Sequence, residues 1–371
     1  MGRPARALLD AQALRHNLQQ VRARAPRAKV MAVVKANGYG HGLIWVAQAL
    51  KEADAFAVAS IEEGFQLRQA GIQQPIVLLE GFFQADELPT LAHYRLSPVV
   101  HDAEQVHLLE AAQVSAPLTV WLKIDTGMHR LGFAPPAGRA AYERLRACRA
   151  VGEVRLMSHL ASADDTSDPA TREQLDVFLP LARALGVPAS CANSAGVIAW
   201  PDSHLDWVRP GLMLYGATPM LDSSAETLGL KPVMTLATAL IAVQQRQRGD
   251  AVGYGGDFRC PEDMPVGVAA IGYGDGYPRH APSGTPVLVN GRAVPLIGRV
   301  SMDMITLDLR SQPDARIGDP VVLWGEGLPV DDVAQRAGTI AYELLCHVAE
   351  RIPRVSGVGQ STVSAQAARG N

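Results

Sequence analysis

Short apolar runs recur through the first 215 or so residues, and most are separated by stretches of helical periodicity. Segment 10–25 begins on a capping Asp10 and places Leu14, Leu18 and Val21 along one face. The same helical pattern recurs at 43–53, 61–70 and 171–185. The apolar runs that predict strands lie at 30–34, 55–59, 75–79, 96–100, 118–124, 154–160, 189–192 and 205–208.

Strands that alternate with helices predict a parallel sheet with crossover helices. Eight such units in just over 200 residues favour a (β/α)8 barrel of the TIM type. A doubly wound open sheet is the alternative. That fold usually offers a glycine-rich dinucleotide turn, and no G-x-G-x-x-G motif opens a helix in this chain.

The pattern changes after about Leu228, where β-like runs punctuated by Gly and Pro replace the helical periodicity. These runs lie at 236–243, 266–271, 285–289, 304–309 and 320–324, and short helices are predicted at 329–336 and 342–350. The fold class is therefore α/β plus β. We expect a barrel domain over residues 1–228 and a mainly β domain over 229–371, with a loose tail from about Ser356.

Composition narrows the class of protein. A net charge of -3 and 48% hydrophobic residues indicate a soluble globular chain with no general attraction to nucleic acid or anionic membranes. No apolar run approaches the roughly 18 residues of a membrane span, and Asp10 interrupts any signal-peptide core. The four cysteines have no paired spacing, so we expect no metal site, a reducing compartment and a cytoplasmic location.

Lysine is rare, because only five of the 34 basic residues are lysines: Lys29, Lys35, Lys51, Lys123 and Lys231. Arginine replaces lysine as a surface cation, but it cannot lose its proton and act as an amine nucleophile. Each remaining lysine is therefore a candidate for chemistry that needs an amine.

Polar residues concentrate directly after the predicted strands, where a (β/α)8 barrel places its active site. Lys35 ends an apolar run, so we expect its amine to lie in a partly desolvated site, which favours the neutral form that attacks aldehydes. A lysine extending to solvent from the barrel rim is the alternative, although arginine would serve equally there. The turns at 193–196 and 209–212 follow the last two strands, where barrels often bind phosphate.

These residues together resemble the alanine racemase family. The resemblance runs from about Pro4 to about Arg354 and includes the family's lysine signature, A-V-V-K-A-N-G-Y-G-H-G, at 32–42. A second motif, K-I-D-T-G-M-H-R-L-G, stands at 123–132. The other matching segments are 207–216, 253–255, 271–276 and 298–303.

The resemblance implies an isomerase that interconverts L-alanine and D-alanine, with pyridoxal 5'-phosphate held as a Schiff base on Lys35. Racemisation removes a proton from one face of Cα and delivers another to the opposite face, and the family pattern gives these roles to Lys35 and Tyr254. His159 is expected to bond to the tyrosine, and Arg209 to face the pyridine nitrogen. Without the resemblance, Tyr254 reads as an exposed turn residue and Arg209 as a partner of Asp206.

Other roles carried over from the family concern the phosphate and the substrate. The residues expected to bind the phosphate are Tyr39, Ser194, Gly211, Leu212 and Tyr342, and Asn193 is expected to support the turn. Arg130 and the backbone N–H of Met302 are expected to bind the substrate carboxylate. Lys123 matches a lysine that is often carbamylated, and the entrance residues are Asp164, Tyr273, Arg299 and Asp303. The family also implies a homodimer, in which Tyr254 and Met302 act on the partner's Lys35.

Three other functions stay open at this stage. A pyridoxal-phosphate decarboxylase of the same architecture would normally carry an acidic residue at the pyridine nitrogen and a cysteine in the second domain. A non-catalytic pyridoxal-phosphate carrier would normally lack the second domain. A broad-specificity amino-acid racemase is closest, and the sequence does not choose between supplying D-alanine to the cell wall and degrading it.

Overall fold

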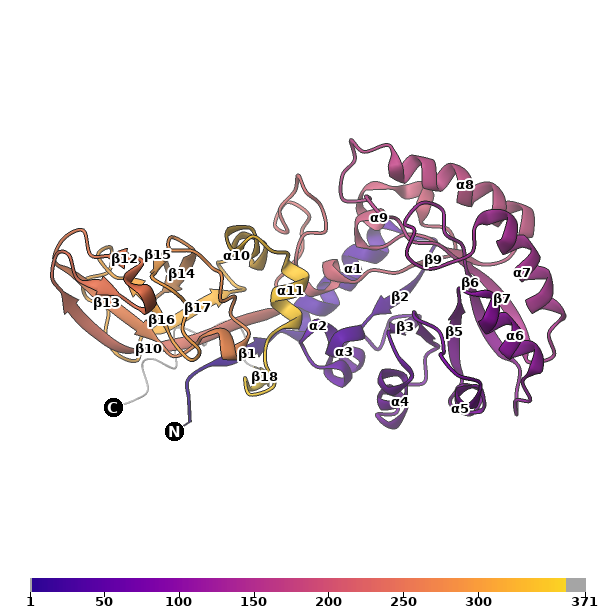
Figure 1. The fold of residues 1–371 in the computed structure, drawn as a ribbon, viewed down its shortest axis with the longest axis horizontal. Coiled ribbons are helices and arrows are strands. Elements are labelled where there is room, and N and C mark those ends of the chain that lie inside the picture. The colour runs from indigo at the N-terminus through magenta and orange to yellow at the C-terminus, as the bar shows by residue number, and fades with distance from the viewer. Residues whose placement is uncertain (1, 358–371) are drawn as a thin grey trace. The chain divides into compact units, whose positions relative to one another are not determined.

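The computed structural model describes residues 2–357, and the contacts within the chain divide it into two compact units (Figure 1). The barrel unit comprises Arg15–Leu214 and Thr218–Leu230. The β unit comprises the described parts of Met1–Leu14, Tyr215–Ala217 and Lys231–Asn371.

The barrel unit is built on eight parallel strands that close into a barrel, as the sequence predicted. The ring closes where the last strand pairs with the first, with Lys29 opposite Trp207. In chain order the strands are β2 (Lys29–Val33), β3 (Ala55–Val58), β4 (Ile76–Leu78), β5 (Leu96–Val100), β6 (Leu118–Lys123), β7 (Val151–Met157), β8 (Ala189–Ser190) and β9 (Trp207–Val208). Most of their residues are apolar and buried because the faces of a barrel strand are largely covered, and β7 departs most from this pattern, with Glu153 and Arg155 partly exposed.

Helices surround the barrel; the first helix precedes the first barrel strand, and the others follow that strand or a later one. The longest, α8 (Ala170–Leu185), buries Leu175 and Phe178 on one face, and Gly186 ends it in a left-handed conformation. The others are α1 (Ala11–Arg24), α2 (Lys35–Tyr39), α3 (Leu43–Ala49), α4 (Ile61–Gln69), α5 (Leu88–Tyr94), α6 (Ala103–Ala111), α7 (Pro135–Ala147) and α9 (Ser194–Ala199). Short 3-10 turns lie at η1 (Ala85–Glu87), η2 (Pro201–Ser203) and η3 (Leu212–Tyr215).

The β unit contains one eight-stranded sheet in the order β13-β16-β15-β14-β17-β10-β1-β18. An extra pairing of β10 with β13 closes six of these strands into a ring. The strands are β1 (Arg6–Leu9), β10 (Met234–Arg246), β13 (Met264–Ala269), β14 (Pro286–Val289), β15 (Arg292–Ile297), β16 (Ile305–Asp308), β17 (Pro320–Trp324) and β18 (Arg354–Ser356). Smaller elements are the hairpin of β11 (Ala251–Val252) and β12 (Phe258–Arg259), the turns η4 (Tyr254–Gly256) and η5 (Tyr273–Asp275), and the helices α10 (Val330–Ala337) and α11 (Ala341–Cys346).

The beginning of the chain corrects the expected domain limits. The sequence predicts a barrel domain over residues 1–228, but β1 pairs antiparallel with β10 and parallel with β18, so it belongs to the β unit. Ala7 and Leu9 are buried, and an alternating run of only four residues carries too weak a signal to place a strand from sequence. Ser356 ends β18, and the rest of the predicted tail lies outside the described residues from 358 onward.

Residues 2–357 contain neither a membrane-spanning helix nor a cluster of metal-binding side chains. None of the described helices is both long enough and apolar enough to cross a membrane. The same residues hold no group of three or more His, Cys, Asp or Glu side chains placed to bind a metal ion.

Candidate active site

The polar residues predicted for the barrel lie at one rim. Lys35 follows β2, Lys123 ends β6, His159 follows β7 and Arg209 follows β9, and the carboxyl ends of parallel strands point the same way. Their charges act on one another, because Lys35, Arg130 and Arg209 all lower the pKa of both Lys123 and His159. The barrel therefore brings these side chains close enough for their charges to shift one another's pKa.

A left-handed turn follows Lys35. Ala36, Asn37, Gly38 and Tyr39 all have positive φ, between 50° and 61°, which costs roughly 1–2 kcal/mol for each residue with a side chain. The turn is held by its own hydrogen bonds, including one from the Leu43 N–H to Asn37 Oδ1 at 2.9 Å. Strain of this kind persists where it sets the geometry of a site. Here it carries the chain from the partly buried Lys35 to the buried Tyr39.

The two predicted phosphate turns meet at Ser194. Its hydroxyl oxygen accepts hydrogen bonds from the N–H of Gly211 at 2.9 Å and of Met213 at 3.3 Å, which leaves its proton free to be donated to an anion. A Cβ on Gly211 would lie 2.4 Å from Tyr39 Oη, so only glycine allows this close approach. Asn193 caps α9 by accepting from Gly196 N at 2.9 Å, and buried Leu212 follows Gly211.

Arg209 is a buried cation with a fixed orientation. Its Nη atoms donate to Ser190 Oγ and the Ser158 carbonyl at 2.6 Å, to His159 Nδ1 at 3.1 Å and to the Cys191 carbonyl at 3.3 Å. Burial lowers its pKa to about 10, which still leaves it protonated near neutrality. Its Nε–H has no protein acceptor among residues 2–357, so this donor is available to a ligand.

His159 is held as a neutral ring. Burial, and then the charges of Arg209 and Lys123, lower its pKa well below the ordinary value. Its Nδ1 accepts from Arg209, so the single ring proton of the neutral form sits on Nε2. His159 can therefore donate a hydrogen bond from Nε2 to an oxygen.

Lys123 is a buried amine, with 8% of its surface exposed. Burial, followed by the charges of Arg209 and Arg130, lowers its pKa to about 8. Arg130 is exposed on the loop that follows β6, and Asp164, partly buried, follows β7 and accepts from Leu221 N at 3.2 Å through its carbonyl.

The remaining predicted residues belong to the β unit. Tyr254 is 67% exposed and is flanked by Gly253 and Gly255, both with positive φ. An ion pair between Arg299 and Asp257 lies against this turn, since a Cβ on Gly255 would lie 3.0 Å from Asp257 Oδ1. Within the β unit, Tyr254 is therefore an exposed turn residue, as expected without the family resemblance. Its catalytic role stays a prediction.

Tyr273 and Met302 lie on two neighbouring loops of the β unit. The Tyr273 N–H donates to the Ser301 carbonyl at 3.0 Å, and the next residue, Gly274, donates to the Met302 carbonyl at 2.9 Å. Met302 is half exposed, Asp303 follows it, and Tyr342 is exposed near the start of α11. The candidate residues thus form one set on the barrel and one on the β unit.

The sequence predicted no role for Ser190. This residue is buried, accepts from Arg209 and donates to the Trp207 carbonyl at 2.8 Å. The only signal for it was a hydroxyl in a short apolar run. Arg209 does not pair with Asp206, whose carboxylate instead accepts from Ala189 N at 2.8 Å.

Comparisons with known proteins agree with the resemblance. The model of the alanine racemase N-terminal domain matches residues 9–219, and that of the C-terminal domain matches 233–356. The alanine racemase of Nitrosococcus oceani is 60% identical over 349 residues, covering 94% of this chain and 98% of that protein. A biosynthetic alanine racemase of Escherichia coli is 51% identical over 350 residues, covering 94% and 98%.

Solved structures give the same answer. The crystal structure of biosynthetic alanine racemase from Pseudomonas aeruginosa matches with a TM-score of 0.93 and 48% identity, covering 96% of this chain and all of that one. The alanine racemase of Acinetobacter baumannii matches with a TM-score of 0.89 and 38% identity over 96% and 100%. The chain, with its closed barrel and its lysine at the end of β2, belongs to the alanine racemase family of isomerases.

Proposed function

We propose that this protein interconverts L-alanine and D-alanine, with pyridoxal phosphate bound on the barrel. The observation that carries the proposal is the cradle of Tyr39, Ser194 and Gly211 at the same rim as Lys35. Because Gly211 has no Cβ, Tyr39 Oη can lie against it, and the Ser194 hydroxyl accepts from the Gly211 N–H and keeps its own proton to donate, which suits a phosphate.

The barrel residues fit a planar cofactor with an anionic end. When bound, the cofactor supplies an electron-withdrawing ring that acidifies the Cα proton of the amino acid. Lys35 would provide the amine for its aldehyde, and Arg209 would face the pyridine nitrogen. Because Arg209 keeps its own proton, it would leave that nitrogen unprotonated. Tyr39, Ser194, Tyr342 and the backbone of Gly211 and Leu212 would hold the phosphate.

Two bases on opposite faces of Cα move the protons. Lys35 Nζ serves one face and Tyr254 Oη the other, so one base removes a proton while the other delivers one. A phenol is a weak base at neutral pH, and its anion needs hydrogen-bond donors. Neutral His159, with its proton on Nε2 and Arg209 behind it, is suited to donate to that phenolate.

The substrate carboxylate binds to Arg130 and to the Met302 N–H, and Asp164, Tyr273, Arg299 and Asp303 form a narrow entrance that favours small amino acids. Two copies of the chain complete each site, with Tyr254 and Met302 acting on the partner's barrel. The four free thiols agree with a cytoplasmic enzyme.

A panel of L-amino acids, incubated with the cofactor-loaded protein and analysed by chiral chromatography, tests the substrate. We expect D-alanine to form far faster than any other product. Comparable rates with lysine or arginine would indicate a broad-specificity racemase. Release of carbon dioxide would indicate a decarboxylase, and binding of the cofactor without turnover would indicate a carrier.

Two variants test the bases and the shared site together. Lys35→Ala and Tyr254→Phe should each abolish racemisation, and Tyr254→Phe should still exchange the Cα proton of one enantiomer with deuterated water. If the sites are shared, randomly mixed subunits of the two variants regain about a quarter of wild-type activity, because half the dimers carry one intact site. Mixed subunits that stay inactive would place both bases in one chain.

A further inference from the structure

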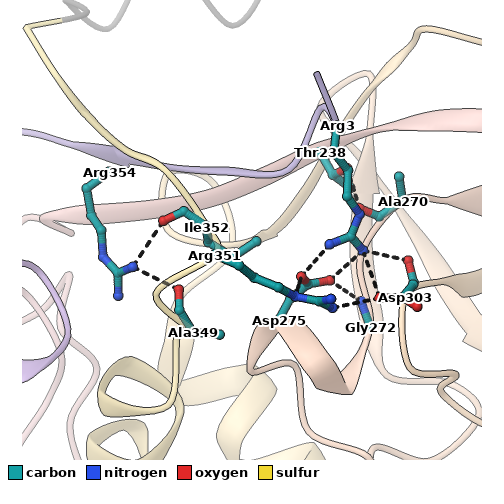
Figure 2. A network of polar contacts seen from close by, with 10 residues as sticks. All are labelled: Arg3, Thr238, Ala270, Gly272, Asp275, Asp303, Ala349, Arg351, Ile352 and Arg354. Atoms are coloured by element: carbon teal, nitrogen blue, oxygen red, sulfur yellow. Dashed lines mark hydrogen bonds and ion pairs between the residues drawn. The ribbon is translucent and has the colours of Figure 1, made fainter. Parts of the chain in front are cut away.

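The most buried carboxylate of the β unit is held by two arginines from opposite ends of the chain (Figure 2). Asp275 has no exposed surface, and both of its oxygens bond to Arg3, with Nη2 to Oδ2 at 2.7 Å. Arg351 Nε contacts Oδ1 at 2.8 Å, and the Gly272 N–H donates to Oδ2 at 2.9 Å. Four donors thus occupy the carboxylate, which leaves it no role as a direct ligand for substrate.

The same two arginines also reach the segment that carries Met302. Arg3 Nη2 donates to the Asp303 carbonyl at 2.8 Å, and Arg351 Nη2 donates to Asp303 Oδ1 at 2.7 Å. Figure 2 shows Asp275, Asp303 and both guanidinium groups gathered at one point. This cluster of Arg3, Asp275, Asp303 and Arg351 ties four separate segments of the β unit together.

The tied segments are in direct backbone contact. A Cβ on Gly272 would lie 2.2 Å from the Ser301 carbonyl oxygen, and one on Gly274 would lie 2.6 Å from Arg351 Nη2. No side chain could therefore separate the turn at 272–276 from the segment at 301–303. Any shift of this turn moves the backbone of Met302 with it.

The hydrogen bonds across this contact fix the direction of one N–H group. The Ser301 carbonyl and the Met302 N–H belong to the same planar trans peptide, so they point in opposite directions. The Tyr273 N–H holds the carbonyl at 3.0 Å and thereby aims the Met302 N–H away from the turn. The bond from Gly274 to the Met302 carbonyl, at 2.9 Å, fixes the next peptide as well.

An ion pair made to a buried carboxylate gains little stability compared with apolar packing, because the carboxylate loses its hydration. The benefit of placing one here is geometric, since several charge-assisted bonds fix four segments at defined distances. We propose that Arg3, Asp275 and Arg351 are positioning residues that aim the Met302 N–H at the substrate carboxylate. The inference rests on the proposed function, in which that N–H binds the carboxylate.

The test compares carboxylate binding in Arg3→Gln and Arg351→Gln with the wild type, using the cofactor-loaded enzyme. Both variants should raise KM for L-alanine and D-alanine by about tenfold, the effect of weakening one charge-assisted hydrogen bond. The change in kcat should be much smaller. Propionate, which has the carboxylate but no amine, should lose affinity by the same factor in calorimetric titrations. Arg3→Lys, which keeps one donor, should fall between Arg3→Gln and the wild type.

Arg310→Gln is the matched control. Arg310 also pairs with a buried carboxylate, Asp308, and with Glu262, but it contacts neither the 272–276 turn nor Met302 in the described structure. We expect Arg310→Gln to lower the melting temperature and to leave KM and the propionate affinity unchanged.

Two results separate this inference from the proposed function. A wild-type enzyme that does not racemise alanine contradicts the function, while calorimetry with propionate still measures carboxylate binding. If Arg3→Gln and Arg351→Gln lose thermal stability like Arg310→Gln and keep wild-type propionate affinity, the cluster is only structural and the inference is wrong.

Discussion

Lys123 allows a sharp test of why the chain keeps a lysine at the end of β6. The side chain is buried, and the nearby cations of Arg209 and Arg130 disfavour its charged form. Only a neutral amine reacts with carbon dioxide, and the resulting carbamate is an anion that would attract both arginines. We therefore expect Lys123 to be carbamylated and to hold Arg130 in place as an anion.

The magnitude follows from the fall in the pKa of Lys123 from 10.5 to about 8. At pH 8 half of such amines are neutral, against about 0.3% for an ordinary lysine. The shift corresponds to about 3 kcal/mol against the charged form. Because the unfolded chain binds the proton more tightly, this penalty is present in full below pH 8 and is relieved as pH rises toward 10.5.

The first assay compares substitutions by charge. Lys123→Glu should keep more activity than Lys123→Gln, and Lys123→Arg should be the least active, because it fixes a third cation beside two arginines. Incubation with 13C-labelled bicarbonate should give a carbamate signal in the wild type that is absent from Lys123→Gln. A fully active Lys123→Arg would show that Lys123 acts as a cation and would refute the reasoning.

The second assay uses stability. In buffer free of carbon dioxide, the free energy of unfolding of the wild type should rise relative to Lys123→Gln by about 3 kcal/mol between pH 8 and 10.5. Bicarbonate should remove this difference, because the carbamate replaces the buried cation. A difference that falls over this range would mean that the amine is stabilised as a cation.

Three further predictions concern the barrel. Gly211→Ala places a Cβ 2.4 Å from Tyr39 Oη, so cofactor affinity measured by absorbance titration should fall by at least about tenfold. Unchanged affinity would show that Tyr39, Ser194 and Gly211 do not bind the cofactor. Arg209→Lys keeps the charge but loses the planar guanidinium that donates to four acceptors, so kcat should fall by about tenfold or more; wild-type turnover would show that charge alone suffices. Arg155→Met removes a guanidinium that lies 5.5 Å from the Trp207 ring, so urea unfolding should show a loss of about 1 kcal/mol with unchanged KM; an altered KM would contradict this purely structural role.

The barrel and most of its site residues were predictable because their signals are local. Each strand is a short apolar run, and Lys35, Lys123 and Arg209 come at or directly after such a run. Parallel strands then bring these positions to one rim without any further information. The left-handed turn after Lys35 was less visible, since Ala36 and Asn37 give no sequence signal for positive φ.

The cluster of Arg3, Asp275, Asp303 and Arg351 was not predictable, because its contacts join residues far apart in the sequence. Arg3 and Asp275 are separated by 272 positions, and their pairing depends on β1 joining the β unit. Arginine is common in this chain, so neither Arg3 nor Arg351 stands out by composition. Only the folded sheet shows that two ordinary arginines and one aspartate meet behind Met302.

The scarcity of lysine drew attention to Lys35 and Lys123. Only the place of each lysine in the barrel explains which positions need an amine that can lose its proton. Lys29 begins β2, at the end of the barrel opposite Lys123, and its Nζ lies 5.2 Å from the ring of Trp207. Arg155 already presents a guanidinium to the same ring at 5.5 Å, so a cation of either kind suits that position. At Lys123 the surrounding charges are positive and the side chain is buried, so a permanent cation is unfavourable there. The same residue type is thus interchangeable with arginine at one end of the barrel and not at the other, because only the second environment requires the charge to be lost.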